Sequence, residues 1–449
     1  RDQDLRECRG WGMLCKDSSC PCRRESLTLI VLGGMSKVNG YPEITTDGRI
    51  LMGPGPSGVH PRVLRALGAP ILGHLDPEFI TIMNRTKDLL AWVFETKNEF
   101  TIPISGTGSA GMETALVNFI EPGDRVLVCV NGLFGTRMAD IVERCGGELE
   151  VIEGEWGKII EPDAVEKSLK ARPAKIVAIV HAETSTGVLQ PLEPVAQIAH
   201  RYGAMLVVDA VTSLGGTPVR VDETGIDVCY SGTQKCLSCP PGLAPITVGR
   251  LAAERLAARK SKVQSWYLDL TMLHSYCGKE RFYHHTAPIN MIYALYESLR
   301  IIREEGLERR YERHSLHSRA FGAGVTAMGL RLFAQEGFRA PMLMAVAIPE
   351  GVDDAAVRRY LLSTYRLEIG GGLGPLKGRI WRVGLMGHSC SSENVVLLLA
   401  GLELFAGRAL GRQGTPAALA ALAAGLKTGG RGASASAAGL GASGQDAAL

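Results

Sequence analysis

The sequence lacks an excess of charge of either sign. Its 49 lysines and arginines nearly balance 46 aspartates and glutamates, which leaves a formal net charge of +3. Nucleic acids and anionic membranes attract strongly basic proteins, so this balance supports neither partner. No apolar run in the sequence reaches the roughly 18 residues that a membrane-spanning helix needs. The apolar segment 27–32 is also too short for a signal peptide. We therefore expect a globular protein without nucleic-acid or membrane partners.

The 11 cysteines form no recognisable disulfide or metal framework. Their number is odd and they are spread along a long chain, which is typical of a reduced, cytoplasmic protein. Cys15, Cys20 and Cys22 lie close together, but their spacing fits no common pair of zinc ligands and no second pair matches them. We therefore expect no metal site. A metal-binding or interaction module within residues 1–45 stays open as the alternative outside enzymology.

Composition divides the chain into four parts. Residues 1–47 carry many charges without sustained periodicity, which predicts a disordered extension. Residues 408–449 are rich in alanine, glycine and serine and contain no aromatic residue, which predicts a flexible tail. Between them we expect a large domain with an N-terminal arm at 48–290. A linking helix and a small domain are expected at 291–407.

Strand and helix patterns alternate through the large domain. Short runs rich in valine and isoleucine are separated by helical stretches. Such alternation is typical of an α/β fold with a mostly parallel sheet covered by helices on both faces. One long helical stretch, Met291–Met328, then leads to a smaller α+β unit. The predicted strands of the large domain are Phe100–Ile104, Arg125–Val130, Glu148–Ile152, Ile176–Val180, Met205–Val208 and Asp227–Tyr230.

Candidate functional residues follow these strands, because ligands bind outside the carboxyl ends of the strands in an open parallel sheet. The glycine-rich segment Ser105–Ser109 precedes a helix. It can cradle a phosphate with unpaired N–H groups, or it can simply cap the helix. Phe134 offers a flat aromatic face or belongs to the core. Asp209 ends a buried strand, where a carboxylate needs a cationic partner or several donors. Lys235 follows the next strand, and burial would make its amine a better nucleophile.

Together these residues predict a phosphate site, a flat apolar face, a carboxylate and a lysine at one edge of one sheet. Pyridoxal phosphate uses all four. The lysine forms a Schiff base, and the carboxylate keeps the pyridine nitrogen protonated so that the ring withdraws electrons. The sequence therefore predicts pyridoxal 5'-phosphate as the cofactor and Lys235 as the catalytic residue.

The chain also resembles the alanine–glyoxylate and serine–pyruvate aminotransferases, which are class V aminotransferases. The resemblance extends from about Gly53 to Leu404. It implies a pyridoxal-phosphate-dependent transferase fold of type I, with a cofactor-binding large domain. The motifs that carry the resemblance are Ser105-Gly106-Thr107-Gly108, Glu183-Thr184-Ser185-Thr186-Gly187-Val188-Leu189-Gln190-Pro191, Val208-Asp209-Ala210-Val211, Ser231-Gly232-Thr233-Gln234-Lys235, Tyr283-His284-His285-Thr286, Gly372-Leu373-Gly374-Pro375 and Trp381-Arg382-Val383-Gly384.

The resemblance implies several cofactor-binding roles. Asp209 pairs with the pyridine nitrogen, and Val211 packs on one face of the ring. Phe134 stacks on the other face, where the family often has tryptophan. Thr184 reaches the ring hydroxyl group. The residues implied to hold or adjoin the phosphate are Thr107, Gly108, Ser109 and Gln234.

Further implications concern the partner subunit and the substrate. Tyr283 and Thr286 resemble residues that cross a dimer interface to the partner's phosphate, so a homodimer is expected. Arg382 would bind the substrate carboxylate. The residues agree, because a guanidinium pairs with a carboxylate in a planar two-bond fork. An arginine between Trp381 and Val383 is not expected to be simply solvated.

The resemblance implies ping-pong transfer of the amino group of alanine or serine to glyoxylate or pyruvate. Only one arginine stands out as a carboxylate clamp, which favours small monocarboxylic amino acids over aspartate or glutamate. Serine–glyoxylate and (S)-ureidoglycine–glyoxylate aminotransferases are the alternatives. The ureidoglycine subgroup has glutamine where His74 stands and asparagine where Tyr283 stands, which argues against it. A desulfurase or lyase on the same fold would need a mobile loop cysteine. It usually has histidine before the lysine, where this chain has Gln234.

Overall fold

The computed structural model describes residues 44, 46, 48–278, 281–406 and 413–436. The disordered extension predicted at 1–47 lies outside the described residues except for positions 44 and 46, and so do the cysteines in it. That part of the prediction therefore stays a prediction.

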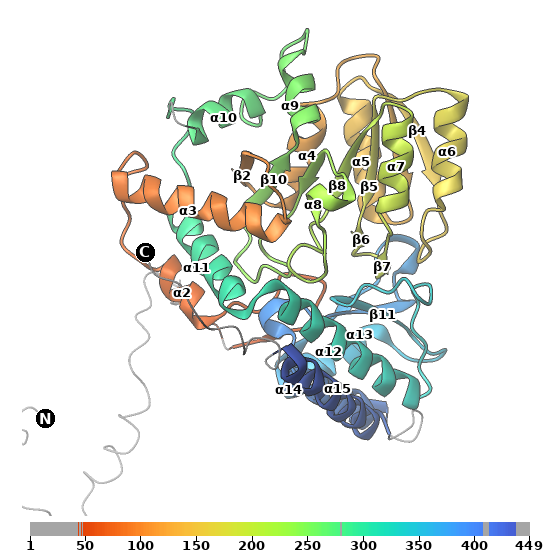
Figure 1. Cartoon of the computed structure of the whole chain (residues 1–449). Helices are drawn as coiled ribbons and strands as arrows, with labels where there is room; N and C mark the ends of the chain where they lie inside the picture. Colours follow the sequence, from red (N-terminus) through yellow and green to blue (C-terminus); the bar gives the residue numbers. More distant parts are fainter. Residues whose placement is uncertain (1–43, 45, 47, 279–280, 407–412, 437–449) are drawn as a thin grey trace, which may run out of the picture. The chain divides into compact units, whose positions relative to one another are not determined.

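A seven-stranded sheet forms the centre of the larger part of the fold (Figure 1). One strand, β10, is antiparallel to both its neighbours, and the remaining pairings are parallel. Every residue of β5 and β8 is buried, which explains why both strands are apolar apart from Asp209, the last residue of β8. The predicted α/β class is confirmed, although β10 was not predicted. The order is β2 (Phe100–Ser105), β10 (Leu243–Val248), β9 (Val228–Tyr230), β8 (Met205–Asp209), β5 (Ile176–Val180), β3 (Arg125–Val130) and β4 (Glu148–Glu153).

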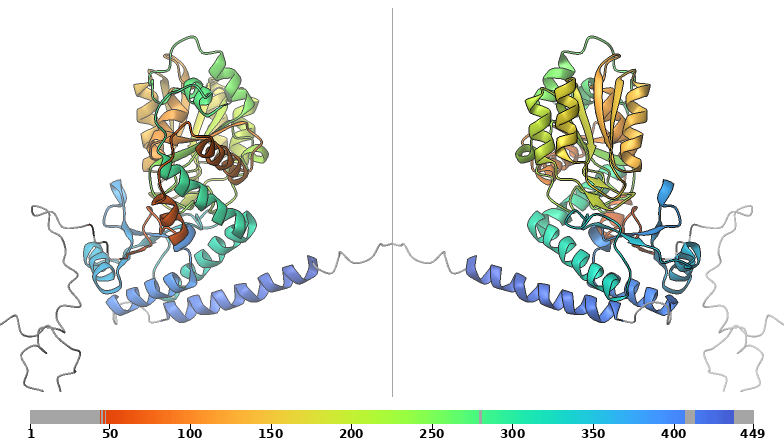
Figure 2. Two further views of the ribbon diagram at one scale, coloured as in Figure 1. Left: turned by 90° about the vertical axis from the view of Figure 1, so that its left-hand side faces the viewer. Right: turned by 90° about the vertical axis from the view of Figure 1, so that its right-hand side faces the viewer.

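Helices cover both faces of this sheet (Figure 2). They include α4 (Gly108–Val117), which packs against β10, and α5 (Leu133–Arg144), which packs against β3. Within the described ranges, no helix is both long and apolar enough to cross a membrane. The other helices of this part are α2 (Pro61–Leu67), α3 (Pro77–Phe94), α6 (Pro162–Ala171), α7 (Glu193–Arg201), α8 (Val221–Thr224), α9 (Arg250–Ala257) and α10 (Leu270–Cys277).

A smaller antiparallel sheet with its own apolar core follows toward the C-terminus. Its fully buried Trp381 lies on the middle strand. The N-terminal strand β1 (Ile50–Leu51) pairs with β12 (Leu367–Glu368), so the N-terminal arm joins this part of the fold. The predicted C-terminal α+β unit is confirmed, and the boundary at 290–291 stays a prediction. The elements are β11 (Leu343–Ala347), β14 (Ile380–Gly384), β13 (Gly370–Gly371), α13 (Asp354–Tyr365) and α14 (Ser392–Ala406).

The helical stretch predicted at Met291–Met328 is two helices rather than one. Helix α11 (Ile289–Glu305) ends at Gly306, and α12 (Leu307–Ala327) begins directly after it. Gly306 has a φ of 83°, a backbone conformation that a right-handed helix does not contain and that glycine adopts without strain. The predicted stretch is therefore helical with a break at Gly306, which the periodicity did not reveal because it persists on both sides of this glycine.

The flexible tail predicted at 408–449 is also wrong in part, because α15 (Gly414–Ser436) is helical. It packs along α12 and α14, and its Ala418 and Leu422 are buried in the apolar core of the small sheet. Alanine is the strongest helix former, so a sequence that reads as low complexity also favours a helix once an apolar face is available.

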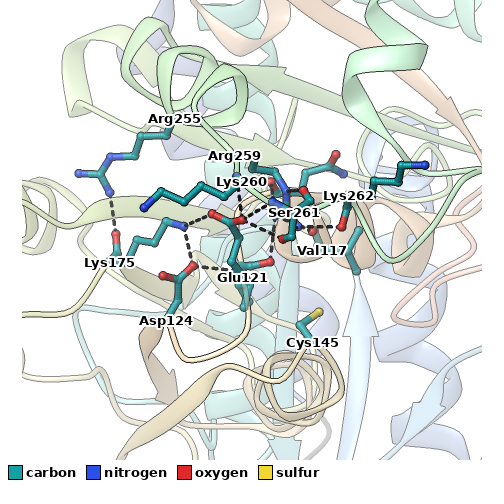
Figure 3. A network of polar contacts seen from close by, with 12 residues as sticks. Val117, Glu121, Asp124, Cys145, Lys175, Arg255, Arg259, Lys260, Ser261 and Lys262 are labelled. Atoms are coloured by element: carbon teal, nitrogen blue, oxygen red, sulfur yellow. Dashed lines mark hydrogen bonds and ion pairs between the residues drawn. The ribbon is translucent and has the colours of Figure 1, made fainter.

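A polar network holds the edge of the large sheet where the parallel strands begin (Figure 3). Lys175, just before β5, pairs with Asp124, just before β3, at 2.5 Å. Glu121 accepts hydrogen bonds from the Ser261 hydroxyl and N–H groups, both at 2.8 Å, and these bonds lower its pKa to about 2. Arg259 donates to carbonyls at the end of α4. These groups satisfy one another, so the network stabilises this edge of the sheet.

Candidate active site

Lys235 lies in the loop between β9 and β10, at the carboxyl edge of the sheet, and only 8% of it is exposed. Its Nζ donates to the carbonyl oxygen of Pro54 in the N-terminal arm. Burial, and to a smaller extent the nearby charge of Arg382, lower the pKa of the amine to about 8. With this pKa roughly a tenth of the amine is neutral at pH 7, far more than for an ordinary lysine, and a nucleophile or proton carrier requires the neutral form.

Asp209 is the last residue of β8 and is 3% exposed. Its Oδ1 accepts from the N–H of Val211 at 2.8 Å, and its Oδ2 accepts from the Tyr230 hydroxyl at 2.8 Å. Burial nevertheless raises its pKa to about 6. No cation forms an ion pair with it among the described residues. The side chain is therefore a buried carboxylate that a cationic ligand would stabilise.

The glycine-rich turn after β2 leads into α4, as predicted. Thr107 is the N-cap residue but provides no side-chain cap, so the first N–H groups of the helix are available to an anion. Gly108 packs closely on the neighbouring loop, since a Cβ there would lie 3.3 Å from Cγ2 of Val211. The predicted phosphate residues Thr107, Gly108 and Ser109 therefore adjoin the loop that Asp209 begins.

Phe134 and Val211 are both half-buried residues that pack against the main apolar core. Phe134 lies in the first turn of α5, where its N–H donates to the Glu183 carboxylate at 3.1 Å. The Arg137 guanidinium lies over its ring, 4.8 Å from the centroid. Both side chains thus keep some exposed surface, which a stacking role requires.

Thr184 and Gln234 are polar residues at the same carboxyl edge. The Thr184 hydroxyl, 4% exposed as a residue, shares a hydrogen bond with the Thr212 hydroxyl. Oε1 of Gln234 is a buried atom that has no hydrogen-bond partner among the described residues. Buried polar atoms are rarely left unpaired, so the carboxamide of Gln234 is arranged for a partner outside the chain.

Arg382 lies on β14 of the small sheet and is 7% exposed. Its Nε donates to the carbonyl of Gly371 at 2.7 Å, and one Nη donates to the carbonyl of Thr184 at 3.2 Å. Burial lowers its pKa to about 10. Within the described part of the chain it pairs with no carboxylate. A buried guanidinium held only by neutral carbonyls is suited to bind the carboxylate of a ligand.

Comparison with known proteins decides the family. A model described as "Aminotransferase class-V" matches residues 65–373, which is more than half of the chain. The chain belongs to the class V aminotransferases. It is therefore a transaminase, and the predicted resemblance is confirmed.

Several known proteins are similar to this aminotransferase in sequence or structure over most of its length. The (S)-ureidoglycine–glyoxylate transaminase of Bacillus subtilis is 44% identical over 384 residues, covering 82% of this chain and 92% of that protein. The crystal structure of the ureidoglycine–glyoxylate aminotransferase from Bacillus subtilis superposes with a TM-score of 0.83 and covers 84% of this chain and 99% of that chain. The crystal structure of an alanine–glyoxylate aminotransferase from Nostoc sp. is 45% identical in sequence and superposes with a TM-score of 0.79. The match covers 81% of this chain and 96% of that chain.

The class V family is pyridoxal-phosphate-dependent, and the residues of this aminotransferase fit that cofactor. A protonated pyridine nitrogen would supply the cation that the buried Asp209 lacks, and its charge would lower the raised pKa of that carboxyl. The N–H groups at the start of α4 would hold the phosphate. Val211 and Phe134 would flank the ring.

No contact joins Tyr283 or Thr286 to Lys235, Asp209 or Arg382 among the described residues. Tyr283 is 57% exposed, and its ring contacts that of His74 with centroids 5.4 Å apart. The segment lies near the phosphate turn, because His285 shares a 2.7 Å hydrogen bond with the Ser105 hydroxyl. The predicted role of both residues across a dimer interface stays a prediction.

Sequence reasoning assigned no role to Glu183 and Tyr230, which both support the site. Glu183 is 1% exposed, and its carboxylate accepts from the N–H groups of Ser185 and Phe134, so it fixes the first turn of α5. Burial raises its pKa. Tyr230 holds Asp209 through its hydroxyl group. Two features of the sequence could have pointed to these residues. Glu183 is a carboxylate in an otherwise apolar region, and Tyr230 ends a buried strand, and buried polar groups require partners.

Proposed function

We propose that this aminotransferase transfers the amino group of a small monocarboxylic amino compound to glyoxylate. The single observation that carries the proposal is Arg382, a buried guanidinium without a carboxylate partner among the described residues and close enough to Lys235 to lower its pKa. One such arginine suits a substrate with one carboxylate. Glyoxylate appears in the names of both the 44% identical and the 45% identical relatives, which supports it as the acceptor.

We place (S)-ureidoglycine first among the amino donors. The Bacillus subtilis relative named for this donor is 44% identical in sequence and gives a TM-score of 0.83 as a structure. This reverses the order predicted from the sequence, which put alanine or serine first with glyoxylate or pyruvate as acceptor.

Alanine is the second candidate, and the residue types at positions His74 and Tyr283, whose rings are in contact, favour it. A ureido group pairs well with a carboxamide, because both offer N–H donors beside a carbonyl acceptor. This chain has an imidazole and a phenol at the two positions where the resemblance implies carboxamides for ureidoglycine enzymes. Relatives named for alanine are 37–45% identical, so the two donors must be compared directly.

The chain's own residues can perform the proton transfers of transamination. Bound pyridoxal phosphate would supply an electron-withdrawing ring that stabilises negative charge at the substrate Cα. Arg382 would bind the substrate carboxylate and so orient the Cα–H bond. Lys235 Nζ, whose pKa is lowered to about 8, can then act as a general base that takes the Cα proton. The resulting ammonium group can act as a general acid that gives the proton back at a second carbon atom. Asp209 would hold the ring nitrogen in its protonated state.

We propose in addition that the enzyme is a homodimer in which Tyr283 and Thr286 reach the partner's phosphate site. Tyr283 is 57% exposed beside Phe282, which is 69% exposed. Such apolar exposure next to the phosphate turn supports an interface there.

The experiment loads the purified protein with pyridoxal phosphate and mixes it separately with (S)-ureidoglycine, L-alanine and L-serine. The visible absorbance of the cofactor should bleach with the true donor and return on addition of glyoxylate. We expect kcat/KM to be highest for (S)-ureidoglycine. A higher value for alanine would select the second candidate. Recovery of the absorbance with pyruvate but not with glyoxylate would refute glyoxylate as the acceptor.

A further inference from the structure

The N-terminal segment Met52–Gly58, here called the strap, is hydrogen-bonded to the small sheet. The N–H of Met52 donates to the carbonyl of Glu368 at 2.9 Å. The N–H of Gly384, two residues after Arg382, donates to the carbonyl of Met52 at 2.7 Å. The far end of the strap is held as well, because the N–H of Gly58 donates to the Ser389 hydroxyl at 2.8 Å.

The same strap is hydrogen-bonded to the lysine loop of the large sheet through Ser57. The N–H of Ser57 donates to the carbonyl of Gln234 at 2.9 Å. Its hydroxyl group donates to the carbonyl of Lys235 at 2.6 Å, and the residue is only 2% exposed. Ser57 therefore pairs with the backbone of two consecutive residues, one of which is the lysine itself.

The strap packs tightly against the Lys235 side chain and against Gly370, which pairs with Arg382 in the small sheet. Gly55 has a φ of +108°, and a Cβ there would lie 2.7 Å from Lys235 Nζ. On the other side, a Cβ on Gly370, which is paired with Arg382 in the sheet, would lie 2.4 Å from Cδ of Pro54. A displacement of the strap would therefore be transmitted to the amine and to the strand that carries the guanidinium.

We propose that Ser57 is a positioning residue that fixes the backbone of Lys235 relative to the strand carrying Arg382. A single substrate molecule can then meet the amine and the guanidinium together. The proposal rests on the roles given to Lys235 and Arg382 under the proposed function. Ser57 acts through Lys235 in this proposal, since its hydrogen bonds go to backbone carbonyls of the lysine loop.

Removing the Ser57 hydroxyl should affect the two functional residues unequally. Arg382 keeps its own hydrogen bonds to Gly371 and Thr184, so binding of the substrate carboxylate should be nearly unchanged. Lys235 loses a buried backbone contact, and we expect kcat to fall about tenfold, the effect of one such hydrogen bond on a transition state. A looser lysine loop also admits water, so the pKa of the amine should rise from about 8 toward its ordinary value of 10.5.

The experiment compares Ser57→Ala with Ser57→Thr, which retains the hydroxyl group, and with a matched control, Thr224→Val. Thr224 also donates a hydrogen bond from a buried hydroxyl to a backbone carbonyl, that of Val219 at 3.0 Å, but it lies in α8. The first measurement uses cofactor-free protein, labelled with acetic anhydride over a pH series. Peptide mass spectrometry then gives the titration midpoint of Lys235. The second measurement gives kcat and KM of the loaded enzyme, and circular dichroism verifies the fold of each variant.

The proposal predicts a higher labelling midpoint and a tenfold lower kcat with little change in KM for Ser57→Ala. Ser57→Thr should restore both quantities, and Thr224→Val should change neither. An unchanged midpoint in folded Ser57→Ala would overturn the proposal, as would the same changes in Thr224→Val. Because the labelling needs no substrate, a shifted midpoint in a protein that uses no glyoxylate would sustain the role of Ser57 and refute only the proposed function.

Discussion

Replacing Lys235 by methionine should stabilise the cofactor-free protein. Methionine has a similar length and no charge, so it removes the cost of burying an ammonium group. Lowering the pKa from 10.5 to about 8 corresponds to about 3 kcal/mol, at about 1.4 kcal/mol for each tenfold change in the protonation equilibrium. The lost hydrogen bond to the Pro54 carbonyl offsets about 1 kcal/mol of this. We therefore expect the free energy of unfolding to rise by about 2 kcal/mol at pH 7.

The effect of this substitution must depend on pH with a definite sign. Below about pH 8 the lysine is charged in both the folded and the unfolded state, and the wild type bears the full burial cost. Between about pH 8 and 10.5 the unfolded state binds more protons, so the stability of the wild type rises with pH. The methionine variant lacks this rise, and its advantage should disappear toward pH 10.5.

Urea unfolding of the two cofactor-free proteins at pH 7 and pH 9.5, followed by circular dichroism, measures the effect. The matched control is Lys175→Met, because Lys175 is a lysine paired with Asp124 at the opposite edge of the sheet. That variant should be no more stable than the wild type at either pH. The reasoning is refuted if Lys235→Met is not stabilised at pH 7, or if its advantage does not shrink at pH 9.5.

Two further predictions concern Arg382 and Glu121. Arg382→Gln should raise KM for the amino donor about 100-fold in steady-state assays, because it removes a charge-assisted hydrogen bond to the substrate carboxylate. The control is Arg379→Gln, which replaces an exposed arginine nearby and should leave KM unchanged. An equal rise in both variants would contradict a carboxylate clamp. The pKa of Glu121 is lowered from 4.5 to about 2, so its contribution to stability is present above pH 4.5 and lost as the pH falls toward 2. Glu121→Gln should therefore unfold more readily than the wild type at pH 6, and the two proteins should converge near pH 2 in urea titrations.

The strand-end rule predicted which residues lie together in the candidate site, because a parallel sheet gathers the carboxyl ends of distant strands at one edge. Asp209, Lys235 and the turn at Thr107 could thus be found from local patterns alone. Strand β10 escaped prediction because the prolines and cysteines before it interrupt the apolar pattern. The role of Ser57 could not be predicted at all. Its partner Lys235 lies 178 positions away, and no local periodicity encodes such a contact.

The antiparallel strand β10 has a consequence for the order in which the protein can fold. Strand β2 comes first among the strands of the large sheet, yet its only neighbour there is β10, whose residues are made much later. Gly58 of the strap is made even longer before its hydrogen-bond partner, because Ser389 is 331 positions further along the chain. A growing chain therefore emerges from the ribosome with an unpaired strand edge and an uncovered lysine loop. Contacts of such sequence separation fold slowly and leave edges open to aggregation, so the yield of this enzyme in cells should depend on chaperones that shield its N-terminal half.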